Sequence, residues 1–148
     1  MYHCVGGSHS STTAAAIHLG LLPMEYIPDR HDFLGVPFYD TLEKCDRGKI
    51  ILRGIDEKGH KIYTLSRQFS PHLVIPAIQD MWRVLEQQED DLMIVNTLPT
   101  VNTLMKIGGF SSRRLQWVRF GRPIVIKGTQ STYMNIVKVV RQIKEKII

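Results

Sequence analysis

The chain has 148 residues, of which 43% are hydrophobic and 22% are charged, as in a single globular domain with a buried core. No apolar run reaches the roughly 18 residues of a membrane span, and the N-terminus lacks the pattern of a signal peptide, so the expected location is cytoplasmic. The formal net charge of +5 favours an anionic partner, which leaves open a nucleotide, a phosphorylated metabolite or a nucleic acid.

A short strand is expected at residues 2–5, followed by a loop, Gly6–Thr12, that is rich in glycine and hydroxyl groups. A helix is expected over residues 12–22, with Ser10 or Ser11 as its N-cap. Three consecutive alanines in this helix would let it pack closely on a sheet.

The segment 23–47 has little periodicity, and a connection of this length in a small domain is often a functional loop or lid. A short helix is expected at residues 29–34. The apolar runs 49–53 and 60–65 flank a turn signal at Asp56–Gly59 and predict a β-hairpin.

Ser70-Pro71 predicts the start of a helix that ends near Gln88. A buried apolar strand is expected at 91–96 and a short helix at 100–107, stopped by Gly108-Gly109. A further turn is expected after those glycines, at residues 111–115.

A second buried strand is expected at 122–127, and a final helix at 131–147 from its helical spacing of apolar residues. Strands that alternate with helices predict a single α/β domain over residues 1–148. The expected architecture is a three-layer sandwich with a mainly parallel sheet, P-loop-like or Rossmann-like, with a β-hairpin insertion.

In open parallel sheets, ligands bind beyond the carboxyl ends of the strands, which is where the loop after the first strand would lie. Gly6 and Gly7 would let the backbone approach an anion, and free N–H groups at the helix start favour negative charge. His9 could donate a hydrogen bond, relay a proton or be phosphorylated, and is the predicted catalytic residue. The predicted hydroxyl donors of the loop are Ser8, Ser10, Ser11 and Thr12.

The loop departs from the phosphate-binding motif GxxxxGK[ST]. Counted from Gly6, Ser11 stands at the second glycine and Thr12 at the lysine that reaches the terminal phosphates. The following buried strand ends at Asn96 rather than at an acidic residue that would hold magnesium. An ordinary nucleoside triphosphatase is therefore disfavoured, and the alternative to anion binding is a tight turn with serine caps.

Basic side chains gather at residues 106–127, which contain six lysines and arginines and no acidic residue. Arg113 and Arg114 could replace the missing lysine, because guanidinium groups grip phosphate oxygens bidentately. The alternative for this pair is a solvated basic surface.

The predicted sheet topology places other polar residues at the ends of its strands. Lys127 and Thr129 would end the last predicted strand near the loop, whereas Arg122 would begin that strand at the opposite edge. Asn96 and Thr97 would end the preceding strand, where they could position a ligand or form a cap.

The histidines outside the loop favour structural roles. His18 lies on the first predicted helix, where packing is preferred over a place at the ligand edge. His31 with Asp29 and Asp32 has only generic metal-ligand spacing, so no metal site is predicted.

The two cysteines, Cys4 and Cys45, form no CxxC pair and favour two free thiols. Cys4 resembles the nucleophile of a thiol phosphatase. That chemistry uses an arginine that closes the loop, where Ser10 and Ser11 stand, so it is disfavoured.

Several motifs resemble a family of small bacterial proteins known as domain of unknown function 3189. The motifs are Tyr2-His3-Cys4-x-Gly6-Gly7-x-His9-Ser10-Ser11, Ala14-Ala15-Ala16-Ile17-His18-Leu19-Gly20-x-Leu22-Pro23, Gly54-x-Asp56-Glu57-x-Gly59-x-x-x-Tyr63, Asn102-x-x-Met105-Lys106-Ile107-Gly108-Gly109, Ser112-Arg113-Arg114-Leu115 and Gly121-Arg122-Pro123. The resemblance covers nearly the whole chain and implies no established activity, cofactor or mechanism.

The first hypothesis is a protein that binds a phosphate-containing ligand or nucleotide at Gly6–Thr12, with phosphoryl transfer or hydrolysis left open. The alternative is a non-enzymatic regulatory module that binds nucleic acid or an acidic partner through its basic face, with salt-dependent affinity. The cofactor is unknown, no membrane partner is expected, and a homo-oligomer is left open.

Overall fold

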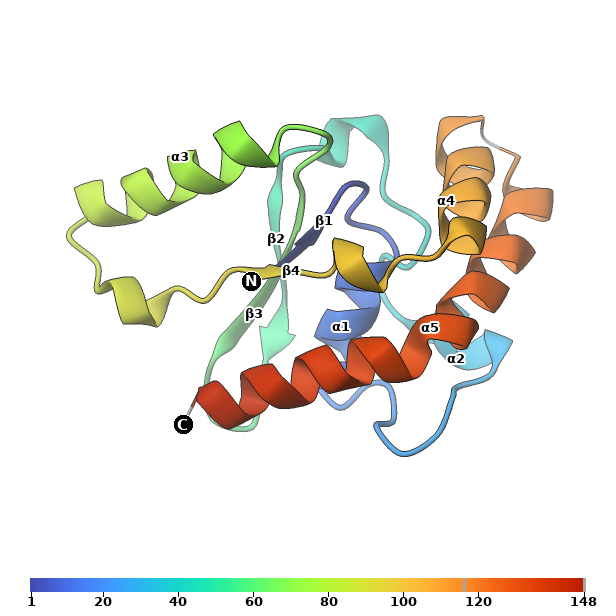
Figure 1. Ribbon diagram of the computed structural model, residues 1–148, viewed down its shortest axis with the longest axis horizontal. Helices are drawn as coiled ribbons and strands as arrows, with labels where there is room; N and C mark the ends of the chain where they lie inside the picture. The colour runs from blue at the N-terminus through green and yellow to red at the C-terminus, as the bar shows by residue number, and fades with distance from the viewer. Residues whose placement is uncertain (116, 148) are drawn as a thin grey trace.

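The computed structural model describes residues 1–115 and 117–147, and only the backbone of residues 113 and 114. In this part of the chain the fold is mixed α/β, with an open four-stranded sheet of order β2-β3-β1-β4 and five α-helices (Figure 1). The strands are β1 (Tyr2–Cys4), β2 (Ile50–Ile55), β3 (Lys61–Ser66) and β4 (Val95–Asn96).

The strand register places the ends of β1 and β3 side by side. β1 pairs in parallel with both β3 and β4, and Cys4 lies opposite Ser66. β2 pairs antiparallel with β3, which confirms the predicted hairpin, and the Asp56 N–H donates to the His60 carbonyl at its tip. The segments after β1 and β3 therefore leave the sheet at the same edge.

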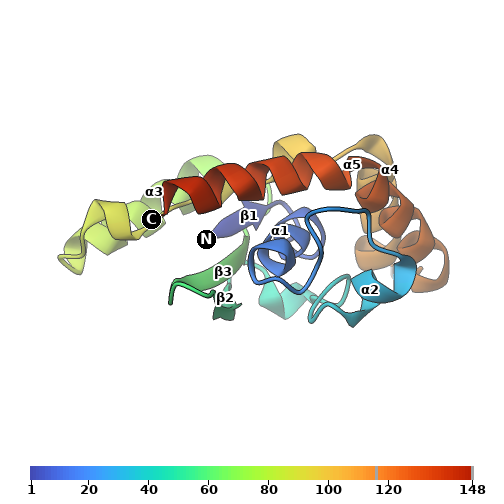
Figure 2. The ribbon, with the colours of Figure 1, turned by 90° about the horizontal axis from the view of Figure 1, so that it is seen from below.

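One group of helices packs around the first strand. α1 packs against β1 and β3, and α5 packs against both α1 and α4. Figure 2 shows α5 running along the molecule toward the C-terminal end. The helices are α1 (Ser10–His18), α2 (Arg30–Gly35), α3 (Pro71–Val84), α4 (Thr103–Gly109) and α5 (Val118–Lys146), with a π-helical turn at Phe110–Arg114 and 3-10 turns at Lys44–Asp46, Glu89–Asp91 and Leu98–Thr100.

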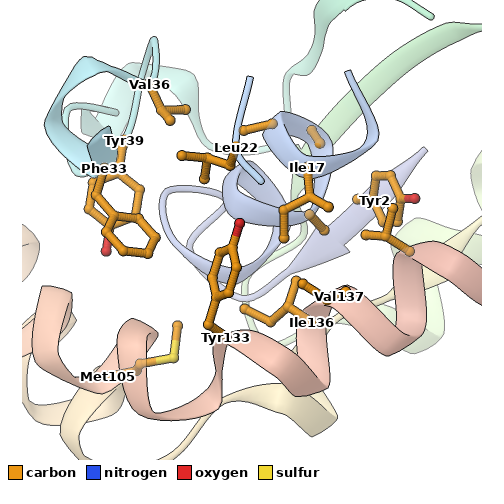
Figure 3. Close-up of a cluster of buried hydrophobic side chains, with 14 of the residues drawn as sticks. Tyr2, Ile17, Leu22, Phe33, Val36, Tyr39, Met105, Tyr133, Ile136 and Val137 are labelled. Atoms are coloured by element: carbon orange, nitrogen blue, oxygen red, sulfur yellow. The ribbon is translucent and has the colours of Figure 1, made fainter. Parts of the chain in front are cut away.

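The core lies between α1, α5 and the sheet (Figure 3). All nine residues of α1 are buried, and the alanines 14–16 let neighbouring elements approach it closely. Tyr133 of α5 is fully buried, and its hydroxyl donates to the Pro23 carbonyl. The core therefore fixes α1, and with it the loop that precedes α1.

The strand predicted at 122–127 is wrong, because these residues form part of α5. The final helix starts at Val118 rather than at residue 131. The β-branched run Ile124-Val125-Ile126 favours a strand locally, but such propensity is weak against tertiary packing. Val125 is fully buried on the helix, next to the backbone of Gly108.

The glycines at 108 and 109 do not stop the chain's helical course as predicted, because they are the last two residues of α4 and the π-helical turn at Phe110–Arg114 follows directly. A Cβ on Gly108 would lie 2.4 Å from the backbone nitrogen of Val125, and one on Gly121 would lie 2.4 Å from that of Ser112. These glycines let the backbones of two helical segments touch. Their role is helix packing rather than chain reversal.

The remaining differences concern the ends of elements and their burial. α1 spans 10–18 rather than 12–22, and β4 contains only the last two residues of the predicted strand 91–96. α3 ends at Val84 rather than near Gln88, and none of its residues is buried. The helix layer that a three-layer sandwich needs on the second face of the sheet is therefore not confirmed.

None of the helices in the described part of the chain is long and apolar enough to cross a membrane.

Candidate functional site

The loop between β1 and α1 contains one glycine that the backbone requires. Gly7 has φ +71°, a conformation that side chains disfavour, and a Cβ there would lie 2.8 Å from Ser66 Cβ. A Cβ on Gly6 would meet no heavy atom within 4 Å, and Gly6 lines a cavity. Gly7 therefore shapes the loop, whereas Gly6 leaves space above it.

The N-terminus of α1 has no cap. The predicted capping by Ser10 or Ser11 is wrong, because His9 occupies the N-cap position and makes no side-chain capping hydrogen bond. Among the described residues, the backbone N–H groups of residues 8–12 donate to no protein acceptor. Unpaired N–H groups at a helix start, together with the helix dipole, attract an anion.

Three of the four loop hydroxyls already have protein partners. The Ser10 hydroxyl bonds the Thr97 hydroxyl at 3.0 Å, and Thr12 donates to the Gly7 carbonyl at 2.7 Å. Ser11 Oγ lies 3.2 Å from Cys4 Sγ. Ser8 is 2% exposed, lines the cavity and makes no side-chain hydrogen bond within the described residues, so the loop offers an anion backbone N–H groups and this one hydroxyl.

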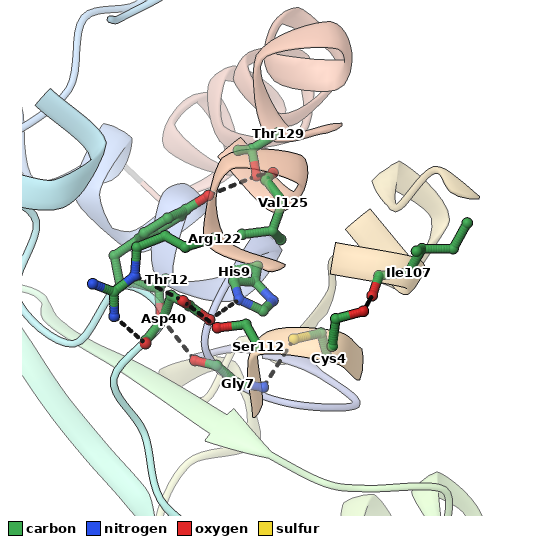
Figure 4. Close-up of polar contacts among 12 residues, drawn as sticks. Cys4, Gly7, His9, Thr12, Asp40, Ile107, Ser112, Arg122, Val125 and Thr129 are labelled. Carbon is green, nitrogen blue, oxygen red and sulfur yellow. Dashed lines mark hydrogen bonds and ion pairs between the residues drawn. The ribbon is translucent and has the colours of Figure 1, made fainter. Parts of the chain in front are cut away.

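His9 is held by a buried carboxylate, Asp40, which no sequence motif indicates. Its Nε2 lies 2.9 Å from Asp40 Oδ1, and the other oxygen of Asp40 accepts from Ser112 Oγ at 2.6 Å and from Arg122 Nε at 3.0 Å (Figure 4). The backbone N–H of Asp40 donates to the Ser8 carbonyl. Asp40 thus ties the loop to the π-helical turn and to α5.

Asp40 is an ionised acceptor at neutral pH. Burial alone would raise its pKa, but the hydrogen bond and charge of His9, with the hydrogen bonds of Ser112 and Arg122, lower the pKa to about 2. Because a carboxylate only accepts hydrogen bonds, His9 must donate from Nε2. Its Nδ1 makes no hydrogen bond within the described residues, so this nitrogen can exchange a proton with a bound group.

A cavity of about 720 Å³ lies over the loop, in the size range of small-molecule sites. The loop contributes Gly6, Ser8, His9 and Ser10, and Cys4 lines the cavity beneath them. The apolar part of the wall includes Leu42, Phe69, Leu98, Val101, Met105 and Phe110. One region of the cavity is therefore suited to an anion and another to an apolar group.

Arg67 is a buried, positively charged residue in the wall of the cavity. It follows β3, its backbone N–H donates to the Cys4 carbonyl, and it is 4% exposed. Its side chain donates to His3 Nδ1 and to the Gln68 carbonyl, and within the described residues it has no carboxylate partner. The sequence carries no signal for this residue, because the pattern of residues does not tell which strand lies beside β1.

The predicted arginines contribute unequally. The side chains of Arg113 and Arg114 lie outside the described residues. The sequence predicts Arg122 at the far edge of a sheet, but α5 brings it to Asp40. Lys127 is exposed on α5, and Thr129 is buried with its hydroxyl bonded to Tyr39, so the predicted strand end at these two residues does not exist.

Asn96 is exposed, and its side-chain oxygen accepts the Leu98 N–H, as a turn cap does. Thr97 is buried and bonds the His3 carbonyl as well as Ser10. As a ligand-binding residue, Asn96 stays a prediction.

The other histidines form structural contacts. His18 is buried between the Tyr2 hydroxyl, 2.8 Å from its Nδ1, and Asp56, 3.1 Å from its Nε2. Asp29 accepts the N–H groups of His31 and Asp32 and so caps α2. Within the described residues, no group of three or more acidic, histidine or cysteine residues could hold a metal ion.

A family model described as a protein of unknown function, DUF3189, matches residues 1–145. No curated protein and no solved structure matches the chain.

Proposed function

The chain belongs to the DUF3189 family, whose function is unknown, and we propose from its site that it binds a phosphate-containing small molecule or nucleotide. The phosphate group would lie at Gly6–Thr12, against the N–H groups of residues 8–12. The observation that carries this proposal is the uncapped start of α1, which opens on the cavity. Four loop residues line the cavity wall: Gly6, Ser8 and His9, which precede the helix, and Ser10, which begins it.

The charge and shape of the cavity support the same ligand class. Arg67 adds positive charge in a buried position, where water screens it little. The apolar wall would accommodate a base or another apolar group attached to the phosphate. His9, oriented by Asp40, would donate or accept a proton at the bound group.

We also propose that the fold is a reduced P-loop-like or Rossmann-like sheet. The two parallel pairings of β1 support this class, as does the loop at the carboxyl end of β1. The mainly parallel sheet and the three layers are part of the proposal.

The test is thermal unfolding with inorganic phosphate and a series of nucleotides. A ligand at a hundred times its Kd should add about 2.7 kcal/mol to the stability, which raises the Tm of a domain this size by roughly 5–10 °C. Gly6→Ala places a methyl group in the cavity and should abolish the shift, whereas Gly35→Ala on α2 should keep it.

No shift at millimolar phosphate or nucleotide would contradict the proposal. Salt-sensitive binding to nucleic acid that is equal in the wild type and in Gly6→Ala would instead favour the basic face.

A further inference from the structure

We propose that Cys4 is a nucleophile that accepts a phosphoryl group from a phosphate monoester bound at the loop. This inference rests on the proposed function, because it uses the same anion site. Cys4 ends β1, lines the cavity and is a free thiol.

The loop folds its donors onto the sulfur. The Gly7 N–H donates to Cys4 Sγ at 3.1 Å, and Ser11 Oγ lies 3.2 Å from it (Figure 4 shows the first contact). The Gly7 amide donates to the sulfur, and because a thiolate only accepts hydrogen bonds, the Ser11 hydroxyl donates to it when Cys4 is ionised. Such hydrogen bonds and the dipole of α1 stabilise negative charge on sulfur. The thiolate is the nucleophilic form of cysteine, so these contacts favour attack.

Independent observations point to an anion above the sulfur. Ser8 is 2% exposed, lines the cavity and has a hydroxyl with no hydrogen bond within the described residues. The N–H groups of residues 8–12 have no protein acceptor there either. A phosphoryl group seated against these donors would lie at the mouth of the loop whose base holds Cys4.

The sequence disfavours this chemistry because Ser10 and Ser11 stand where a loop arginine would close on the phosphate. The structure offers Arg67 in its place, from the segment that follows β3. Arg67 lines the cavity, is buried, donates to His3 and to the Gln68 carbonyl, and has no carboxylate partner in the described part of the chain. A guanidinium group in this cavity would offset the charge of the phosphoryl oxygens.

The reaction proceeds in two balanced steps. The Cys4 thiolate attacks phosphorus, an S–P bond forms, the bond from phosphorus to the ester oxygen breaks, and the leaving oxygen takes a proton from His9. Water then attacks phosphorus, His9 accepts its proton, the S–P bond breaks, and inorganic phosphate and the thiolate are released. No oxidant, reductant or metal is consumed in either step.

The test is oxygen exchange between ¹⁸O-labelled inorganic phosphate and ordinary water, followed by mass spectrometry. This readout needs no knowledge of the natural leaving group, because phosphate itself forms the phosphocysteine with loss of water and is re-formed from it. Cys4→Ser should slow the exchange at least about a hundredfold, and Ser11→Ala roughly tenfold. Cys45→Ser, at an exposed thiol outside the cavity, should exchange like the wild type.

Calorimetric titration of phosphate on the same samples separates the two proposals. If the wild type binds phosphate but exchanges oxygen no faster than Cys4→Ser, the nucleophile is overturned and the binding function stands. If the wild type binds no phosphate, the proposed function fails and the inference fails with it. Cys4→Ala provides a second variant if serine at this position prevents folding, and wild-type exchange no faster than buffer alone also overturns the proposal.

Discussion

The adjacent glycines of the loop after β1 have different physical roles. Gly7 has a positive φ and lies against Ser66, so it sets the path of the chain. Gly6 lies in open space beside the cavity, so it determines what can bind rather than how the loop folds. Substitution of Gly7 therefore tests folding, and substitution of the adjacent Gly6 tests ligand binding.

Gly7→Ala should destabilise the fold by about 2 kcal/mol or more, from backbone strain together with the contact on Ser66. Gly6→Ala should change the free energy of unfolding by less than about 0.5 kcal/mol. Urea denaturation measures both, and equal stabilities for the two variants would contradict the role assigned to Gly7.

At this scale the sequence predicts part of the site. The glycines, the hydroxyls and His9 can be identified because they are contiguous. Asp40 cannot be identified from the sequence, because its contact with His9 spans 31 positions. The segment 23–47 that contains Asp40 is nevertheless typical of a functional loop. Three loop hydroxyls that the sequence predicts to bind a ligand also bond protein groups. The partner of Ser10 is Thr97, which lies 87 positions away, so the sequence carries no signal for this contact.

In α5, tertiary packing overrides the secondary structure that the local sequence pattern favours. Its buried positions recur at helical spacing from Gly121 onward, but Pro123 and the β-branched run after it indicate a strand. The strand β1, the hairpin, α2 and α3 can be predicted because each carries a local turn or cap signal. The backbone contact of α4 with α5 has no comparable local signature.

Gly121→Ala should destabilise the protein by roughly 1–3 kcal/mol, because its Cβ would collide with the backbone around Ser112. Because Ser112 also bonds Asp40, the change should displace the residues that orient His9. Gly35→Ala, at the last residue of α2, is the control in chemical denaturation, because a Cβ there would meet no heavy atom within 4 Å. A Gly121→Ala variant as stable as the wild type would contradict the close packing of these helices.

For the whole molecule, buried histidines make stability depend on pH. Burial, with the charges of Arg67 and the N-terminus, lowers the pKa of His3 to about 4, and burial also lowers that of His18. The unfolded chain therefore binds these protons first, near pH 6.5. The contribution of these histidines should be complete above that pH and fall as the pH drops toward 4, with His3 contributing about 3 kcal/mol of the loss.

Protonation of Asp40 causes a second loss of folding stability at lower pH. Since its pKa is lower in the fold than in the unfolded chain, its stabilisation is present above about pH 4 and disappears toward pH 2. His3→Asn keeps an acceptor for Arg67 and should flatten the first part of the curve but not the second. Denaturation across pH 3–8 measures this, and an unchanged slope in the variant between pH 6.5 and 4 would contradict the assignment.

A crystal structure of the protein grown with tungstate, a heavy analogue of phosphate, would test the anion site at the start of α1 most directly. We expect anomalous density at the start of α1, with oxygens within hydrogen-bond distance of the N–H groups of residues 8–12, and no such density in Gly6→Ala. Tungstate bound only outside the loop, with the start of α1 empty at saturating concentration, would contradict the proposed anion site.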